Sequence, residues 1–161
     1  MKTSNKNIGE SLKNSIEGAI KTCIGVAGFV ILFSLLLSIL KNNFLFKFIL
    51  NKLCIFFNAD KNLIEGFLLG LVEMTNGCYL ISTSSIDISK KLILISFLLA
   101  FSGFSIISQV YSFTYKHGIN IKRYIKIKFM QGLIASITCI VLYRIPIFSM
   151  YLDAFTDKIL I

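Results

Sequence analysis

The chain has 161 residues, of which 55% are hydrophobic and only 16% are charged. A soluble domain carries about 25% charged residues, so the composition argues against a soluble globular protein. The net charge of +9 is compatible with nucleic-acid binding. Most lysines, however, fall between apolar runs, where the tendency of basic loops to stay on the cytoplasmic side explains them. We therefore expect a lipid bilayer as the environment and no nucleic-acid partner.

The amino-terminal segment, residues 1–18, has the pattern of an amphipathic helix. Ile8, Leu12 and Ile16 recur at helical spacing, with charged and polar residues between them. This segment is expected to lie at the membrane interface and to lead into a first membrane span at about 19–40. Residues 22–40 carry no charge, and about 20 such residues cross a hydrocarbon core.

The next apolar run, residues 44–57, is short and is interrupted by Lys47, Asn51 and Lys52. Its length fits either an interfacial helix or a re-entrant hairpin. Turn-forming residues follow at 58–62, and a further apolar segment covers 63–84.

Two more spans are expected at about 90–113 and 129–149, before a short carboxyl-terminal tail at 150–161. The predicted fold class is therefore an all-α, polytopic membrane protein with about four transmembrane segments, a broken helix and one re-entrant or interfacial helix. The lysine-rich segments 41–62 and 114–128 carry net charges of +3 and +5, from four bases less one acid and from five bases. The positive-inside rule places both in the cytoplasm.

The stretch GLVEMTNGCYLIS, residues 70–82, places polar groups inside an apolar segment. In a continuous helix, Gly66, Gly70, Glu73 and Gly77 would share one face, and the glycines would allow a neighbouring helix to approach closely. A charged residue at mid-membrane costs roughly 3 kcal/mol on insertion scales. Glu73 is therefore expected to be protonated, paired or facing water.

The triplet Thr75-Asn76-Gly77 predicts a break in this helix, because Asn and Gly disfavour a helix interior. Two half-helices buried at mid-membrane are a common way for transporters to build a binding site. Glu73, Thr75 and Asn76 are then candidate solute-binding residues. The alternative is that Glu73 and Asn76 only join helices through hydrogen bonds.

A second polar stripe runs along the segment 90–113. Ser102, Ser105 and Gln109 follow one another at helical spacing, with Gly103 adjacent. Ser105 and Gln109 are candidate solute-binding residues, with Gln109 as a partner for Glu73, and Gly103 is a candidate packing residue. Helix packing alone is again the alternative.

Catalytic, metal and cofactor sites are not indicated by the sequence. There is a single histidine, the four cysteines lie in apolar runs without a CxxC pair, and no hydrolase or phosphate-binding motif occurs. We therefore expect neither an enzyme nor a cofactor-dependent protein.

The pattern GFLLGLVEMTNG followed by AFSGFSIISQVYS resembles the carboxyl-terminal half of the YlbJ-type sporulation integral membrane proteins. The opening GESLKNSIEGAIKTCIGVAGFVILFSLL is similar to the start of the nucleoside-recognition, or Gate, domain of those proteins. The resemblance covers residues 8–143 and implies a Gate-like transmembrane domain at 19–149 in a bacterial, multi-pass cell-membrane protein.

The resemblance further implies a sporulation-linked protein that binds or transports a small polar solute or ion. Family members are typically more than twice as long, with an amino-terminal half that has its own polar membrane motif. We therefore expect a second membrane half or a homo-oligomer as partner. The competing interpretation is a structural membrane subunit, or a truncated half of a larger protein, that does not transport.

Overall fold

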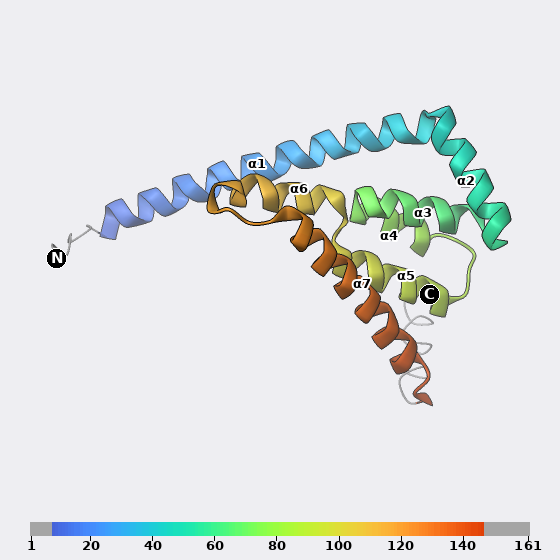
Figure 1. The fold of residues 1–161 in the computed structure, drawn as a ribbon. Helices are drawn as coiled ribbons and strands as arrows, with labels where there is room; N and C mark the ends of the chain where they lie inside the picture. Colours follow the sequence, from blue (N-terminus) through green and yellow to red (C-terminus); the bar gives the residue numbers. More distant parts are fainter. Residues whose placement is uncertain (1–7, 147–161) are drawn as a thin grey trace, which may run out of the picture.

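The computed structural model describes residues 8–146. The expected tail at 150–161 and the first seven residues of the amphipathic segment lie outside this range. The described part is helical (Figure 1). Its elements are α1 (Ile8–Asn42), α2 (Phe44–Phe57), α3 (Lys61–Val72), α4 (Met74–Ser82), α5 (Ile88–Phe101), α6 (Gly103–Thr114), the short 3-10 helix η1 (Tyr115–His117) and α7 (Ile121–Tyr143).

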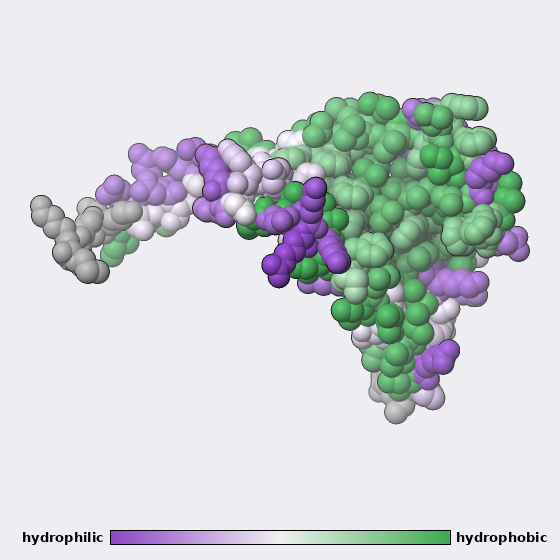
Figure 2. All heavy atoms as spheres, in the orientation of Figure 1, coloured by the Kyte–Doolittle hydropathy of each residue, from purple (hydrophilic) through white to green (hydrophobic). Residues whose placement is uncertain are grey.

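Helix α1 joins the predicted interfacial helix and the first predicted span into one continuous helix of 35 residues. Polar side chains near the expected boundary bond back to the helix: Ser15 Oγ donates to the Ser11 carbonyl at 2.8 Å and Thr22 Oγ1 to the Gly18 carbonyl at 2.9 Å. Its length is about 52 Å, well beyond the hydrocarbon core of about 30 Å. The start of α1 protrudes from the body and is largely hydrophilic (Figures 1 and 2).

Helix α2 is a single helix, so the re-entrant alternative for residues 44–57 is wrong. Asn43 caps its start by accepting a hydrogen bond from the Leu45 amide at 2.8 Å. Asn58 ends it in the left-handed conformation, with φ at 46°. At 14 residues, about 21 Å, α2 is too short to cross a bilayer.

The hairpin is found instead at 63–84, where α3 and α4 lie side by side and run in opposite directions (Figure 1). A methyl group added to Gly66 would lie 2.9 Å from Ile81 Cγ1, and Gly70 lies against Gly77. The glycines were predicted to share one face of a continuous helix, and in the structure they do not. They line the interface between two arms of 12 and 9 residues, each too short to cross the membrane.

The predicted helix at 90–113 is also interrupted, between α5 and α6. Ser102 and Gly103 are both left-handed, with φ values of 75° and 72°. Two consecutive left-handed residues cannot continue a right-handed helix, and Ser102 therefore ends α5 and precedes α6.

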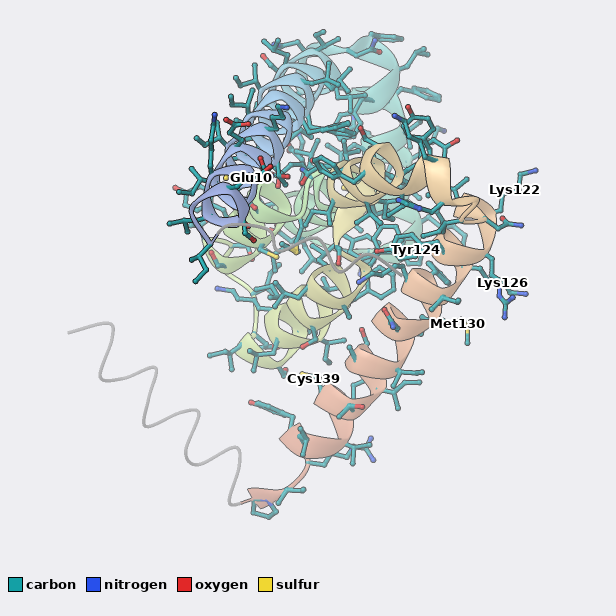
Figure 3. All side chains as sticks on the ribbon, turned by 90° about the vertical axis from the view of Figure 1, so that its left-hand side faces the viewer. Glu10, Lys122, Tyr124, Lys126, Met130 and Cys139 are labelled. Carbon is teal, nitrogen blue, oxygen red and sulfur yellow. The ribbon has the colours of Figure 1, made fainter. Side chains whose placement is uncertain are left out.

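The last span begins earlier than the predicted residue 129. Asn120 caps α7 by accepting a hydrogen bond from the Arg123 amide at 3.2 Å. Consequently the basic residues after position 121 lie on the first two turns of a helix and not in a loop. In Figure 3, Lys122, Lys126 and Met130 point away from the body, and Tyr124 points towards it.

Within residues 8–146, three stretches are long and apolar enough to cross a membrane: Ile8–Asn42, Ile88–His117 and Ile121–Tyr143. The fourth expected crossing, at 63–84, reverses direction at its middle. The exterior is typical of a membrane protein, because large hydrophobic side chains cover most of the visible face (Figure 2).

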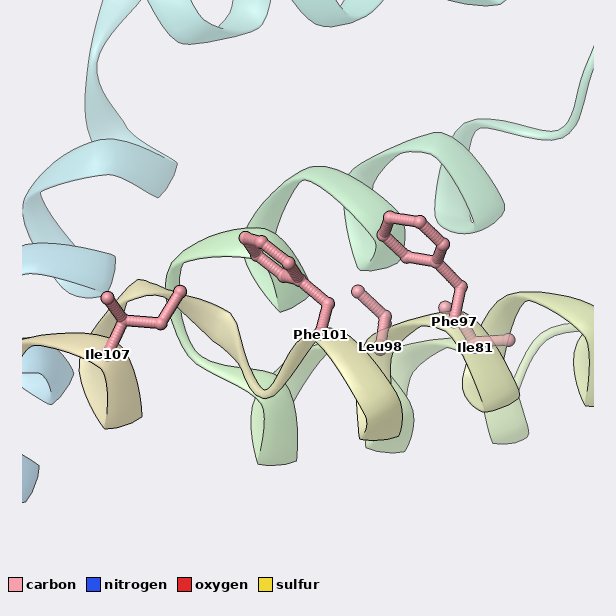
Figure 4. Packing of buried hydrophobic residues seen from close by; sticks show 5 residues of the cluster. All are labelled: Ile81, Phe97, Leu98, Phe101 and Ile107. Atoms are coloured by element: carbon pink, nitrogen blue, oxygen red, sulfur yellow. The ribbon is translucent and has the colours of Figure 1, made fainter. Parts of the chain in front are cut away.

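The core lies around α5, which is flanked by the α3–α4 hairpin and by α7. Its buried members are Ile81, Phe97, Leu98, Phe101 and Ile107 (Figure 4). Helix α7 approaches α5 closely where Gly132 meets the ring of Phe97, and Ser136 Oγ donates to the Ile93 carbonyl at 3.1 Å. This packing holds the break at Ser102 in place beside the hairpin.

Candidate functional site

Glu73 forms the tip of the α3–α4 hairpin. Its backbone is extended, with φ at −139° and ψ at 110°, and it is at once the last cap of α3 and the first cap of α4. The carboxylate accepts hydrogen bonds from the backbone amides of Thr75 at 3.0 Å and Asn76 at 2.8 Å, and from Asn76 Nδ2 at 2.9 Å. A negative charge at the positive end of a helix is favourable. The expected pairing of Glu73 is therefore met by its own helix end.

The predicted break in this segment is present, but its position differs. Thr75, Asn76 and Gly77 were expected to be unwound, and they form the first turn of α4. The interruption is at Glu73, because its carboxylate satisfies two of the four amides that a new helix start leaves without partners.

The two interrupted helices meet at their breaks. A methyl group on Gly103 would lie 3.1 Å from the Gly70 carbonyl oxygen, 3.1 Å from the Met74 amide nitrogen and 3.4 Å from the Val72 carbonyl oxygen. The start of α6 thus touches the end of α3 and the start of α4 directly through the backbone. We call this meeting point the crossing. Gly103 is buried there, as are Gly70 and Gly77.

The carboxyl-terminal end of α5 adjoins the crossing. The carbonyls at this end, which have no partner within the helix, accept hydrogen bonds from Ser102 and Lys128. The Leu98 carbonyl accepts from the Ser102 amide at 2.8 Å, and the Leu99 carbonyl accepts from Ser102 Oγ at 3.4 Å. Lys128 Nζ on α7 donates to the Ala100 carbonyl at 3.4 Å and to Ser102 Oγ at 3.2 Å. A cation therefore lies at the negative end of α5.

The remaining predicted site residues are only partly brought together. Ser105 is buried on α6, and Gln109 Nε2 donates to Ser105 Oγ at 3.4 Å, one turn along the same helix. Among the described residues, no hydrogen bond joins Gln109 to Glu73 or Asn76. Thr75 is exposed at the hairpin tip.

Lys128 was missed as a site residue because it was counted with the loop lysines. A signal was available. Tyr124, Lys128 and Gly132 are spaced by four residues, which places them on one face of a helix. Since that face packs against α5, a lysine within it has to find a partner in the protein.

Within the described part of the chain, no group of three histidine, cysteine, aspartate or glutamate side chains could hold a metal ion. A groove of about 660 Å³ runs between α5 and α7 and is almost entirely apolar. Its lining residues are Leu92, Ser96, Leu99, Ala100, Ala135, Thr138, Cys139 and Leu142. The hairpin-tip residues Glu73, Thr75 and Asn76 are not among them.

Comparisons with known proteins give a similar membrane protein. No family model matches the chain, and no solved structure matches it. The sporulation integral membrane protein YlbJ of Bacillus subtilis strain 168 is 28% identical to it over 151 residues. The match covers 92% of this chain and 37% of the relative, so the chain spans just over a third of the relative's length. This similarity and three stretches long and apolar enough to cross a membrane support a multi-pass membrane protein that is similar to a YlbJ-type sporulation integral membrane protein.

Proposed function

We propose that the chain is a Gate-type membrane protein, linked to sporulation, that binds or moves a small polar solute or ion at the crossing. One observation carries this proposal: a helical hairpin and a broken helix meet at their breaks, with Gly103 against the backbone of α3 and α4. Discontinuous helices at membrane depth are a recurrent way to present backbone groups and helix ends to a solute. The proposed role involves no catalysis.

The polar groups at the hairpin tip suit this role. Asn76 Nδ2 is held by the Glu73 carboxylate, so Glu73 fixes the orientation of the Asn76 amide. Asn76 Oδ1 then remains to accept a hydrogen bond from a solute, and the exposed Thr75 lies beside it. Ser105 and Gln109, which are joined by a hydrogen bond at 3.4 Å, lie on α6, the second half of the broken helix.

The site is open on one side, since Thr75 is exposed. A second surface is needed to shield a polar solute from lipid. We propose that a second membrane half or a second copy of the chain supplies it, which fits a chain that spans 37% of the length of its relative.

The test uses a chimera in which this chain replaces the matching stretch of Bacillus subtilis YlbJ, with heat-resistant spores as the readout and membrane protein level as the control. Glu73→Gln keeps the size and polarity of the side chain but loses one acceptor. If the tip is a functional site, this variant lowers spore yield while the protein stays in the membrane.

A structural role is the second candidate, and it rests on a specific observation. The hydrogen bonds that the Glu73 carboxylate accepts all come from its own helix start. If Glu73→Gln sporulates normally while Glu73→Leu removes the protein from the membrane, the tip only stabilises the fold and the site proposal is wrong.

A further inference from the structure

Lys128 differs from its basic neighbours on α7. Lys122, Arg123 and Lys126 are exposed, whereas Lys128 is partly buried on the face that packs against α5. Snorkelling to the interface accounts for exposed basic residues near a helix end. It does not account for a lysine whose ammonium donates to groups at the end of another helix.

The partners of Lys128 are oxygen atoms at an interrupted helix. Its ammonium lies 3.4 Å from the Ala100 carbonyl oxygen and 3.2 Å from Ser102 Oγ, and that hydroxyl donates to the Leu99 carbonyl at 3.4 Å. Carbonyls at the carboxyl-terminal end of a half-helix, together with a hydroxyl, form the kind of oxygen set that coordinates monovalent cations in discontinuous membrane helices.

We propose that Lys128 is a tethered cation, which fills the position at the end of α5 that a free monovalent cation would otherwise take. The protein then needs no sodium ion to stabilise this break. Removing the ammonium exposes the oxygen set and turns it into a binding site for a small monovalent cation. The consequence for transport, that solute movement does not depend on sodium at this position, rests on the proposed function, whereas the cation site itself does not.

The charge arrangement favours a cation over a simple hydrogen-bond donor. The ammonium lies at the negative end of α5, and no carboxylate lies within 4 Å of it in the described part of the chain. Glutamine is neutral and shorter than lysine, so it would leave the helix end without its compensating charge and would not fill the position of the ammonium.

The experiment measures the thermal unfolding of the detergent-purified full chain. It compares sodium chloride with N-methyl-D-glucamine chloride at equal ionic strength, because the organic cation is too large for the oxygen set. The variants are Lys128→Ala, Lys128→Gln and, as a matched control, the exposed Lys126→Ala. No solute is needed, so failure of this inference is distinguishable from failure of the proposed function.

We expect wild type and Lys126→Ala to melt at the same temperature in both salts. Lys128→Ala and Lys128→Gln should melt several degrees lower in the organic salt and recover with sodium in a saturable manner. If Lys128→Ala does not fold, Lys128→Gln alone decides. The inference is overturned if the foldable Lys128 variants show no sodium-specific gain, or if wild type shows the same gain.

Discussion

The contact of Gly103 with the hairpin can be tested by a pair of glycine substitutions. Gly103 and Gly118 have nearly the same backbone conformation, with φ values of 72° and 69°. A methyl group on Gly103 would meet backbone atoms of Gly70 and Met74 at 3.1 Å, whereas one on Gly118 would meet nothing within 4 Å. Alanine at either position is therefore strained by the left-handed conformation, but only Gly103→Ala also crowds the crossing.

The expected magnitudes separate the two effects. A left-handed conformation costs a non-glycine residue about 1–2 kcal/mol, and this term is common to both variants. Overpacking adds about 1–3 kcal/mol. It applies to Gly103→Ala because the obstructing atoms are backbone atoms that cannot rotate away. The difference between the two variants should therefore be about 1–3 kcal/mol, the larger loss falling on Gly103→Ala.

Far-UV circular dichroism during heating, on protein purified in the same detergent, measures the comparison directly. The melting temperature of each variant is compared with that of the wild-type protein. Equal losses for Gly103→Ala and Gly118→Ala would show that α6 does not touch the hairpin at Gly103. The crossing, and the function proposed for it, would then be wrong.

Three further substitutions test the hairpin and the α5–α7 contact by the same measurement. Gly77→Ala places a methyl group 2.6 Å from the Gly66 carbonyl oxygen and against the Gly70 backbone, so it should cost about 1–3 kcal/mol or more, whereas Gly28→Ala, with nothing within 4 Å, should be neutral or slightly stabilising. Glu73→Ala removes a helix cap and should cost about 0.5–2 kcal/mol, more than Glu73→Gln, which keeps one acceptor. Gly132→Ala places its methyl group nearest the Phe97 ring, at 2.9 Å, so its cost should shrink in a Phe97→Leu background; a cost independent of residue 97 would contradict that contact.

The membrane class and most helices could be predicted, because uncharged runs of about 20 residues are typical of membrane spans and rare in soluble domains. The interruption near Glu73 was also predictable in kind, since Asn76 and Gly77 weaken a helix. Its form was not. The spacing of Gly66, Gly70 and Gly77 would place them on one face of a continuous helix. The same spacing also allows the glycines of α3 to face the glycine of α4 once the chain reverses at Glu73. Periodicity alone does not distinguish these arrangements.

The break at Ser102 was missed for a different reason. Ser102, Ser105 and Gln109 keep a helical spacing across it, so the polar stripe reads as one face of one helix. The local signal is the Ser-Gly pair, and it is weak, because glycine is common in membrane helices. What fixes two consecutive left-handed residues is tertiary: the close approach of Gly103 to the hairpin, and the bonds of Ser102 to Leu99 and Lys128.

The two charges at the crossing explain why the breaks can persist in an apolar setting. Glu73 lies at the positive end of α4, and Lys128 lies at the negative end of α5, so each charge is compensated by a helix end and not by the other. That leaves the end of α3 and the start of α6 without a charged partner. Ser102 gives α6 no side-chain cap. These two ends are in contact at Gly103, and they are of opposite sign. Each end therefore compensates the other, and the breaks persist without a further charged group.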